Sequence, residues 1–334
     1  MKQDILKIEE AISFTKQTFE SELKRQLKLT NISAPIAVLA GTGINDDLNG
    51  IERTVLFPVK ALSDKKAVIV NSLSKWKRVR LQELDVEEGK GIITDMRAIR
   101  PDEDYSPIHS VYVDQWDWEK RISKKSRSIN FLKKEVIKIY TALKETETKI
   151  AEKFDSIQAV LPNDILFIHT EELLQKYPDL TPKEREFEIT KEFGAVFLIG
   201  IGGRLSNGET HDGRAPDYDD WSSKNEDGYF GLNGDILLWH PILQESFEIS
   251  SMGIRVDRLA LIDQLNKTGQ NTRKELQFHK LLLTDILPES IGGGIGQSRV
   301  CMFMLRNKHI GEVQVGIWSD SVKEKSKEEG IILL

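Results

Sequence analysis

The chain has 334 residues, of which 39% are hydrophobic and 30% charged, and its formal net charge is −6. This composition is typical of a globular protein with a sizeable core and excludes a disordered chain. The net negative charge and the lack of a long run of lysine or arginine disfavour a protein that binds the phosphate backbone of a nucleic acid. The single cysteine, Cys301, excludes an intramolecular disulfide. Because there is no apolar signal core and no apolar run that could span a bilayer, we expect a cytoplasmic protein.

Helices and short strands alternate in the first part of the chain. Residues 4–28 place apolar side chains at helical spacing, which predicts an amphipathic helix. Residues 31–39 have strand character, and Pro35 favours an edge or interface position for that strand. A glycine- and Asx-rich loop is predicted at 41–50. The elements predicted next are two short strands that could pair (55–59, 67–70), a helix (72–81), and a hairpin with a loop of roughly eight residues (91–99, 109–119).

The second part of the chain predicts longer elements separated by polar segments. Thr181, Pro182 and Gly194 stand where a helix prefers its N-cap, its first residue and its C-terminal glycine, so a helix is predicted over 181–193. Residues 211–229 are polar and acidic, and we interpret them as a loop or lid, with disorder as the alternative. The other predicted elements are helices at 129–154, 257–278 and 297–305, strands at 165–168 and 195–201 that are expected to be buried, strands at 234–239 and 247–256, and a glycine-rich segment at 291–296.

The spacing of these elements bears on the fold class. Strands separated by long excursions, without regular strand–helix alternation, predict an α/β (α+β) fold with an antiparallel-rich β-sheet flanked by helices. We find no internal repeat, low-complexity segment or linker in the sequence. Residues 1–334 are therefore expected to form a single domain.

The hairpin of residues 91–119 carries polar residues that set it apart. Arg100 ends its first strand, and Gln115, Asp117 and Glu119 share one face of its second strand because side chains alternate. A solvated sheet face would look similar, but here two tryptophans occupy the other face. One guanidinium facing carboxylates and an amide suits a substrate that combines phosphate and amino-acid groups.

A glycine-rich segment near the C-terminus predicts nucleotide binding. Gly292, Gly294 and Gly296 would let a flat ring approach the backbone. Arg299, one turn into the following helix, could stack on that ring or meet a phosphate. The segment lacks the Lys-Ser/Thr of phosphate-cradling loops, and a glycine-rich turn with a surface arginine is the plain alternative.

Two acids on neighbouring predicted strands suit a metal ion. Asp235 and Glu248 could hold Mg²⁺, which uses one or two carboxylates together with substrate phosphates, although two exposed carboxylates would give the same pattern. Arg255 lies seven residues after Glu248, so on a regular strand the two would face oppositely. If both serve one pocket, we expect a β-bulge near Met252 and Gly253.

Several other polar residues are ambiguous by themselves. Lys77 could be a solvated helix residue, and Asp46 could merely cap its loop. Asp217, Asp219 and Asp220 could form a solvated acidic loop.

Taken in order, these segments resemble the three motifs of class II aminoacyl-tRNA synthetases, especially the aspartyl and asparaginyl group. Pro35 resembles the interface proline of motif 1, and residues 100–104 followed by Gln115 and Asp117 resemble motif 2. The metal strand and motif 3 are resembled by Asp235, residues 248–255 and residues 292–299. The resemblance to the ammonia-dependent asparagine synthetases is closer and covers essentially the whole chain. The segments that carry it are 72–77, 100–104, 109–119, 215–222, 231–235 and 291–299.

The resemblance implies a class II synthetase-like core and ATP-dependent synthesis of L-asparagine from L-aspartate and ammonia. A β-aspartyl adenylate would form, with release of pyrophosphate and then AMP. Arg100 would hold the α-phosphate, Arg299 would contact the adenine or the distal phosphates, and Asp235 and Glu248 would hold Mg²⁺. The motif 1 resemblance implies a homodimer.

The resemblance also implies an orientation for the amino acid. In aspartyl-tRNA synthetases, a lysine and an arginine matching Lys77 and Arg255 hold the side-chain carboxylate. Our hypothesis is that here they clamp the α-carboxylate, so that aspartate binds end-reversed. The α-ammonium would then be held, and ammonium drawn in, by Asp46, Gln115, Asp117 or Asp219, and Asp46 is the candidate for orienting or deprotonating the incoming nitrogen. The residues expected to contact the amino acid are Asp46, Lys77, Gln115, Asp117, Asp219, Ser250, Ser251 and Arg255, and those expected to contact the nucleotide are Arg100, Ser110, Gly292, Gly294, Gly296 and Arg299.

Ammonia is favoured over glutamine as the nitrogen donor. Cys301 lies in an apolar helical segment that predicts a core position, whereas a glutaminase uses a reactive thiolate. The alternatives are a tRNA-charging enzyme and an inactive synthetase-like regulator. The first would need an anticodon-binding module and a basic face, and the second is disfavoured because Arg100, Arg255 and Arg299 are all present.

Overall fold

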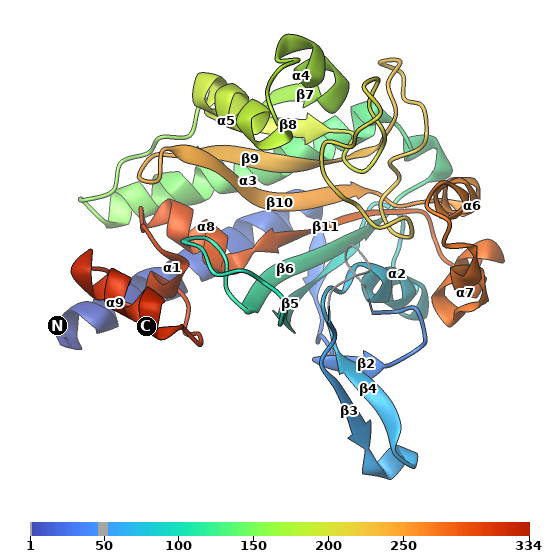
Figure 1. Ribbon diagram of the computed structural model, residues 1–334, viewed down its shortest axis with the longest axis horizontal. Helices are drawn as coiled ribbons and strands as arrows, with labels where there is room; N and C mark the ends of the chain where they lie inside the picture. Colours follow the sequence, from blue (N-terminus) through green and yellow to red (C-terminus); the bar gives the residue numbers. More distant parts are fainter. Residues whose placement is uncertain (1, 46–52) are drawn as a thin grey trace.

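A computed structural model describes residues 2–45 and 53–334. Within these residues the fold is built on an eight-stranded sheet with the strand order β1-β5-β6-β11-β10-β9-β8-β7 (Figure 1). Its strands are Leu29–Asn31 (β1), Gly91–Ile99 (β5), Tyr112–Arg121 (β6), Leu166–His169 (β7), Ala195–Ile199 (β8), Asn233–His240 (β9), Glu245–Ile254 (β10) and Ser290–Gly296 (β11). The outermost pairs, β1–β5 and β7–β8, are parallel and the inner pairs are antiparallel, which confirms the predicted sheet.

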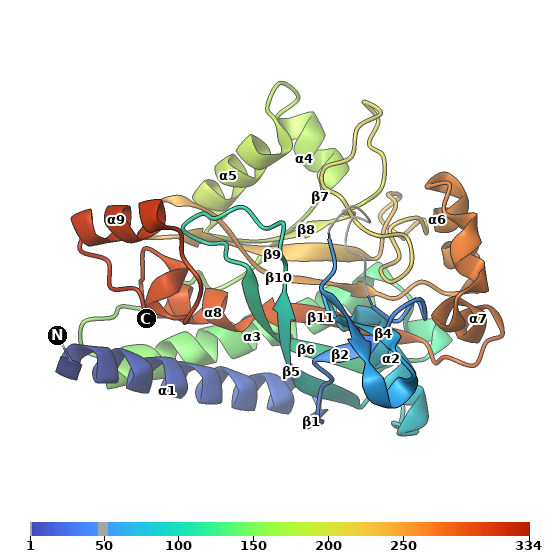
Figure 2. The same ribbon diagram turned by 60° about the horizontal axis from the view of Figure 1, so that its bottom comes forward.

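Helices cover both faces of this sheet (Figure 2). On one face, three helices and the inward side chains of the strands form the main hydrophobic core: α1 (Lys2–Leu27), α3 (Ile129–Lys153) and α8 (Gln297–Met304). The other face carries α4 (Thr170–Lys176) and α5 (Pro182–Phe193) over β8, and α2 (Ser74–Glu83) lies beside β6. The chain continues through α6 (Arg258–Lys267), α7 (Gln277–Leu283) and α9 (Asp320–Glu328). No helix among the described residues is long and apolar enough to cross a membrane.

Local signals placed several elements correctly. Helix α5 begins with a capping box between Thr181 and Glu184 and a proline in its first turn, and it ends at Gly194 with φ 75°. The alternation of β6 is also confirmed, because Trp116 and Trp118 are buried in the main core. Strand β8 is buried along its whole length.

Two predicted elements were wrong. The strand predicted at 31–39 is two strands in different sheets, because β1 ends at Asn31 and β2 (Ala37–Leu39) joins a smaller antiparallel sheet with β4 (Lys65–Ile69) and β3 (Leu56–Val59). The helix predicted at 257–278 is interrupted between α6 and α7, where Gly269 adopts a φ of 70° that right-handed helix does not allow.

The burial of two segments also differs from expectation. Strand β7 lies at the sheet edge, and three of its four residues are only half-buried. Conversely, the acidic residues Asp217, Asp219 and Asp220 are at most 1% exposed, so the solvated acidic loop is wrong. Their burial is possible because basic side chains from distant parts of the chain pair with them.

Candidate active site

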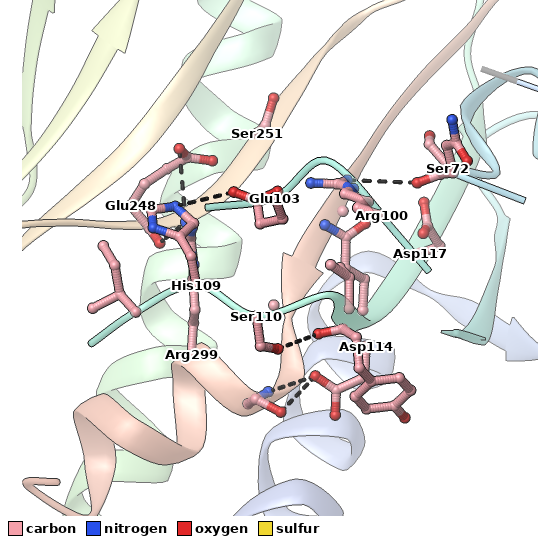
Figure 3. Close-up of a pocket in the computed structure, with 18 of the residues that line it drawn as sticks. Ser72, Arg100, Glu103, His109, Ser110, Asp114, Asp117, Glu248, Ser251 and Arg299 are labelled. Carbon is pink, nitrogen blue, oxygen red and sulfur yellow. Dashed lines mark hydrogen bonds and ion pairs between the residues drawn. The ribbon is translucent and has the colours of Figure 1, made fainter. Parts of the chain in front are cut away.

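A cleft of about 640 Å³ lies on the sheet face opposite the main core. Side chains of β6 point alternately to the two faces of the sheet, so Gln115 and Asp117 line the cleft while Trp116 between them packs into the core. Loop 100–111 and the first turn of α8 form two of its walls (Figure 3), and the segment around Asp219 forms a third.

One end of the cleft contains a buried network of charges. Lys77 of α2 donates to the Asp117 carboxylate and, at 2.9 Å, to the Gly293 carbonyl. Arg255 donates to both oxygens of Glu119 at 2.8–3.1 Å and to the Asp219 carboxylate. The charged side chains are at most 2% exposed. Such burial is tolerable only because each charge has a partner of opposite sign.

Burial and pairing act against each other on the ionisable groups of this network. Burial alone would raise the pKa of Glu119, but the adjacent Arg255 outweighs it and the pKa lies below its ordinary value. Burial lowers the pKa of Lys77, with Asp117 opposing. Among the described residues, Oδ2 of Asp117 has no hydrogen-bond partner, and Oδ2 of Asp219 has only Arg214 Nε, at 3.6 Å. This end of the cleft therefore retains acceptor capacity for a positively charged group.

Strand β11 lies between β6 and β10 beneath these side chains. Glu119 and Arg255 meet across Gly292, where a Cβ would collide with the Glu119 carboxylate and lie 2.6 Å from Arg255 Nη2. A Cβ at Gly294 would lie 2.5 Å from Gln115 Oε1. These glycines therefore leave room for polar side chains that cross the strand, and the approach of a flat ring to them stays a prediction.

Two further guanidinium groups, those of Arg299 and Arg100, line the same cleft. Arg299 donates to the Glu248 carbonyl at 3.0 Å, and its Nη1 lies 3.7 Å from the Glu248 carboxylate. Arg100 contacts the Asn71 carbonyl only at 3.5 Å, and its buried Nε has no partner among the described residues (Figure 3). Both arginines line the same cleft, so they converge although they are far apart in the sequence.

His109 is a site residue that the sequence reasoning missed. Its Nε2 lies 2.9 Å from Arg299 Nη2 and its Nδ1 lies 2.8 Å from Ser106 Oγ. Burial and the charge of Arg299 lower the pKa of His109 to about 4, so the ring is neutral at pH 7. Because a guanidinium can only donate, Nε2 accepts and the proton resides on Nδ1. No local pattern marks a lone histidine in a loop as the partner of a distant arginine.

Arg214, also missed, pairs with one of the two candidate metal ligands, Asp235. It donates to Asp235 Oδ1 at 2.6 Å and to the Ser251 hydroxyl. Burial raises the pKa of Asp235 to about 7, and the nearby negative charge of Glu248 pushes it in the same direction. A single arginine in an acidic segment was the only available signal.

A β-bulge lets residues of β10 share the cleft face. The register with β9 shifts between Glu248 and Ser250, so Glu248, Ser251 and Arg255 all line the cleft. The expected bulge exists, but its predicted position near Gly253 was wrong. Gly253 serves close packing instead, because a Cβ there would lie 2.9 Å from the Asp219 carboxylate.

The predicted site residues fall into three groups. Those that line the cleft are Arg100, Ser110, Gln115, Asp117, Asp219, Glu248, Ser251, Arg255, Gly294, Gly296 and Arg299. Those that contact this lining from behind are Lys77, Asp235, Ser250 and Gly292. Asp46 lies outside the described residues.

Comparisons with known proteins agree on a family and on a fold. The family model described as aspartate-ammonia ligase matches residues 6–330. Proteins named aspartate–ammonia ligase from Parabacteroides distasonis and Bacteroides fragilis are 56% and 53% identical, cover 98% and 99% of this chain, and are themselves covered to 94% and 96%. The asparaginyl-tRNA synthetase of Pyrococcus horikoshii, solved with asparaginyl-adenylate, superposes with a TM-score of 0.65 at 16% identity over 91% of this chain and 67% of its own. The fold is therefore that of the class II aminoacyl-tRNA synthetases.

The Glu119–Arg255 pair yields a stability prediction. Glu119→Gln should lower the free energy of unfolding by about 3–5 kcal/mol, because it leaves Arg255 buried with less compensating charge. Chemical denaturation measures this loss. Asp263→Asn, which breaks the exposed Lys267–Asp263 pair, is the control and should cost no more than about 1 kcal/mol. Equal losses in the two variants would show that Arg255 does not depend on Glu119.

Proposed function

The chain belongs to the aspartate–ammonia ligase family, and from this we infer that its cleft activates the β-carboxylate of L-aspartate with ATP and transfers the acyl group to ammonia. The product is L-asparagine. The observation that carries the mechanism is the convergence of Arg100 and Arg299 with the buried charge network in one cleft. One end suits a polyphosphate and the other suits a zwitterion.

In the proposed first step, Arg100 holds the α-phosphate of ATP. Its Nε, which has no partner in the described part of the chain, and its long contact to Asn71 leave donors available to phosphate oxygens. A β-carboxylate oxygen of aspartate attacks the α-phosphorus, the α–β phosphoanhydride bond breaks, and pyrophosphate leaves. Arg299 orients the nucleotide through its adenine or its distal phosphates. Positioning and charge neutralisation supply most of the acceleration.

Magnesium is part of the proposal, with Asp235 and Glu248 as its ligands. Bound Mg²⁺ would neutralise the charge of the phosphates. No group of three metal-ligating side chains occurs in the described part of the chain, which agrees with an ion held by one or two carboxylates and substrate oxygens. The fit is supported by the positions of the two acids on the neighbouring strands β9 and β10. Arg214 pairs with Asp235 in the free protein.

In the proposed orientation, Lys77 and Arg255 hold the α-carboxylate of aspartate. Both cations already have carboxylate partners, so the substrate must exchange with them. The spare Oδ2 atoms of Asp117 and Asp219 would receive the α-ammonium, so no charge is left alone. The β-carboxylate would then point toward the nucleotide end.

In the proposed second step, the nitrogen of ammonia attacks the activated carbonyl carbon. The bond from that carbon to the AMP oxygen breaks, AMP leaves, and the nitrogen loses one proton to become the asparagine amide. Asp46 stays our candidate for orienting the nitrogen or accepting the proton. Burial raises the pKa of Cys301 to about 12, so this thiol does not supply the thiolate that glutamine hydrolysis would use.

A homodimer, a single domain over residues 1–334 and a cytoplasmic location complete the proposal. Strands from both halves of the chain interleave in the large sheet, which supports one domain. The smaller sheet near Pro35 exposes a group of large apolar side chains, which supports an interface between copies. These are Ile36, Leu39, Leu56, Phe57 and Leu62, each 39–67% exposed.

The interface can be tested by sedimentation. The unchanged protein should sediment as a dimer, and Leu56→Glu should yield folded monomers because it buries a charge only in the dimer. Leu259→Glu, at a position 76% exposed on α6, is the matched control and should leave the dimer intact. A monomeric unchanged protein at micromolar concentration would contradict the homodimer.

The catalytic proposal predicts a defined set of products. Protein supplied with ATP, Mg²⁺, aspartate and ammonium should form AMP, pyrophosphate and asparagine in equal amounts, measured by chromatography. Glutamine in place of ammonium should give little asparagine. Formation of ADP and phosphate would contradict the adenylate, and charging of tRNA would favour the alternative of a tRNA synthetase.

The clamp predicts a selective effect of Lys77→Ala. Losing one charge-assisted contact, worth about 1.5–3 kcal/mol, should raise the KM for aspartate about 10- to 100-fold and leave the KM for ATP nearly unchanged. Arg80→Ala, which changes an exposed cation on the same helix, is the control and should leave both constants unchanged. Normal aspartate affinity in Lys77→Ala would refute the clamp.

A further inference from the structure

A second buried charge cluster lies outside the cleft lining, centred on Asp217. Three cationic or hydrogen-bonding side chains converge on its Oδ2: Lys75 Nζ at 3.1 Å, Arg273 Nη1 at 2.7 Å and His279 Nε2 at 3.0 Å. Asp217 and His279 are fully buried, Lys75 is 1% exposed, and none of the four side chains lines the cleft. Burial alone would raise the pKa of Asp217, but these neighbours outweigh it and hold the pKa below its ordinary range.

The cluster joins elements that carry the amino-acid end of the cleft. Lys75 precedes Lys77 by two residues in the first turn of α2, so the two side chains leave the helix in different directions, one to Asp217 and the other to Asp117. The start of α2 is therefore held between two carboxylates. Asp217 in turn precedes Asp219 by two residues, and Asp219 pairs with Arg255.

The third element is the segment that precedes Asp46. The Phe278 amide of α7 donates to the Thr42 carbonyl, and a Cβ on Gly43 would lie 2.9 Å from Leu276 Cβ and 3.2 Å from His279 Nδ1. Residues 42–43 therefore pack directly on the start of α7. Figures 1 and 2 both show α7 beside α2. Through His279, Asp217 also holds the helix on which this segment rests.

We propose that Asp217 is a positioning residue for the amino-acid substrate, which fixes α2, α7 and the segment of Asp219 relative to one another. The proposal rests on the proposed function, since it concerns the aspartate end of that cleft. The nucleotide end is attached mainly elsewhere, because Arg299 lies on α8, and Arg100 follows β5 and meets the segment before α2 only through its 3.5 Å contact to the Asn71 carbonyl. Disturbing the cluster should therefore change the KM for aspartate much more than the KM for ATP.

The first test is Asp217→Asn, which keeps the shape of the side chain and removes its charge. A displacement of about 1 Å at reacting groups costs up to roughly 100-fold in rate. We expect the KM for aspartate to rise and kcat to fall by about tenfold each, with the KM for ATP changing by less than about twofold. Steady-state assays well below the melting temperature measure this split. Unchanged constants for aspartate, or an equal rise in both KM values, would overturn the proposal.

The matched control is Glu147→Gln on α3, on the sheet face away from the cleft. Glu147 is 2% exposed and accepts from the amides of Val160 and Leu161 and from Arg306, so its loss also disturbs a buried charge cluster. This variant should lower the melting temperature while leaving both KM values unchanged. If it raised the KM for aspartate like Asp217→Asn, a general loss of stability would explain both effects and the proposal would fail.

A second pair of variants covers a failure of Asp217→Asn to fold. His279→Gln retains an N–H that can reach Asp217 and should keep the KM for aspartate within about threefold of normal, whereas His279→Ala should raise it about tenfold. Equal constants in the two variants would contradict the positioning role. If the unchanged protein formed no asparagine, the proposed function would fail, whereas an active protein with these variants unaffected would contradict only the inference on Asp217.

Discussion

The structure of the cleft depends on the constraint that a charge can be buried only with a partner. Arg255 and Glu119 meet at 2.8 Å with almost no exposure to water, and they do so across a strand that separates their own two strands. That crossing requires the sheet order β6-β11-β10 and a residue without a side chain at position 292. The strand order and the glycine at position 292 are thus both needed for this one buried ion pair.

The same constraint explains how a cleft can be full of charges and still receive a charged substrate. Lys77 and Arg255 face Asp117, Glu119 and Asp219, and the spare oxygens belong to the two aspartates. In our proposal a zwitterionic amino acid pairs its carboxylate with the cations of this network and its ammonium group with the aspartates. A ligand of one sign would leave a buried charge uncompensated, so the arrangement favours amino acids over simple anions.

The likeness to asparaginyl-tRNA synthetase shows which features a fold preserves. At 16% identity the backbones still superpose over 91% of this chain, because the alternation of strands and the apolar faces of the helices tolerate many side chains. The likeness to the aspartate–ammonia ligases concerns the side chains as well as the fold, because more than 50% of the residues are identical along nearly the whole chain. The fold alone would not have indicated the chemistry, which resides in particular side chains of the cleft.

Local sequence determined the elements whose cause is local: the two faces of β6 from period-two alternation, and the limits of α5 from Thr181 and Gly194. The order of the polar motifs also indicated the family and that Arg100 and Arg299 would share one cleft. Only the tertiary structure decided where the β10 bulge lies, why position 292 is glycine, and that Asp217 is buried rather than solvated. The physical reason is that the energy of a buried charge depends on partners contributed by distant segments, and no local pattern specifies which segments will meet.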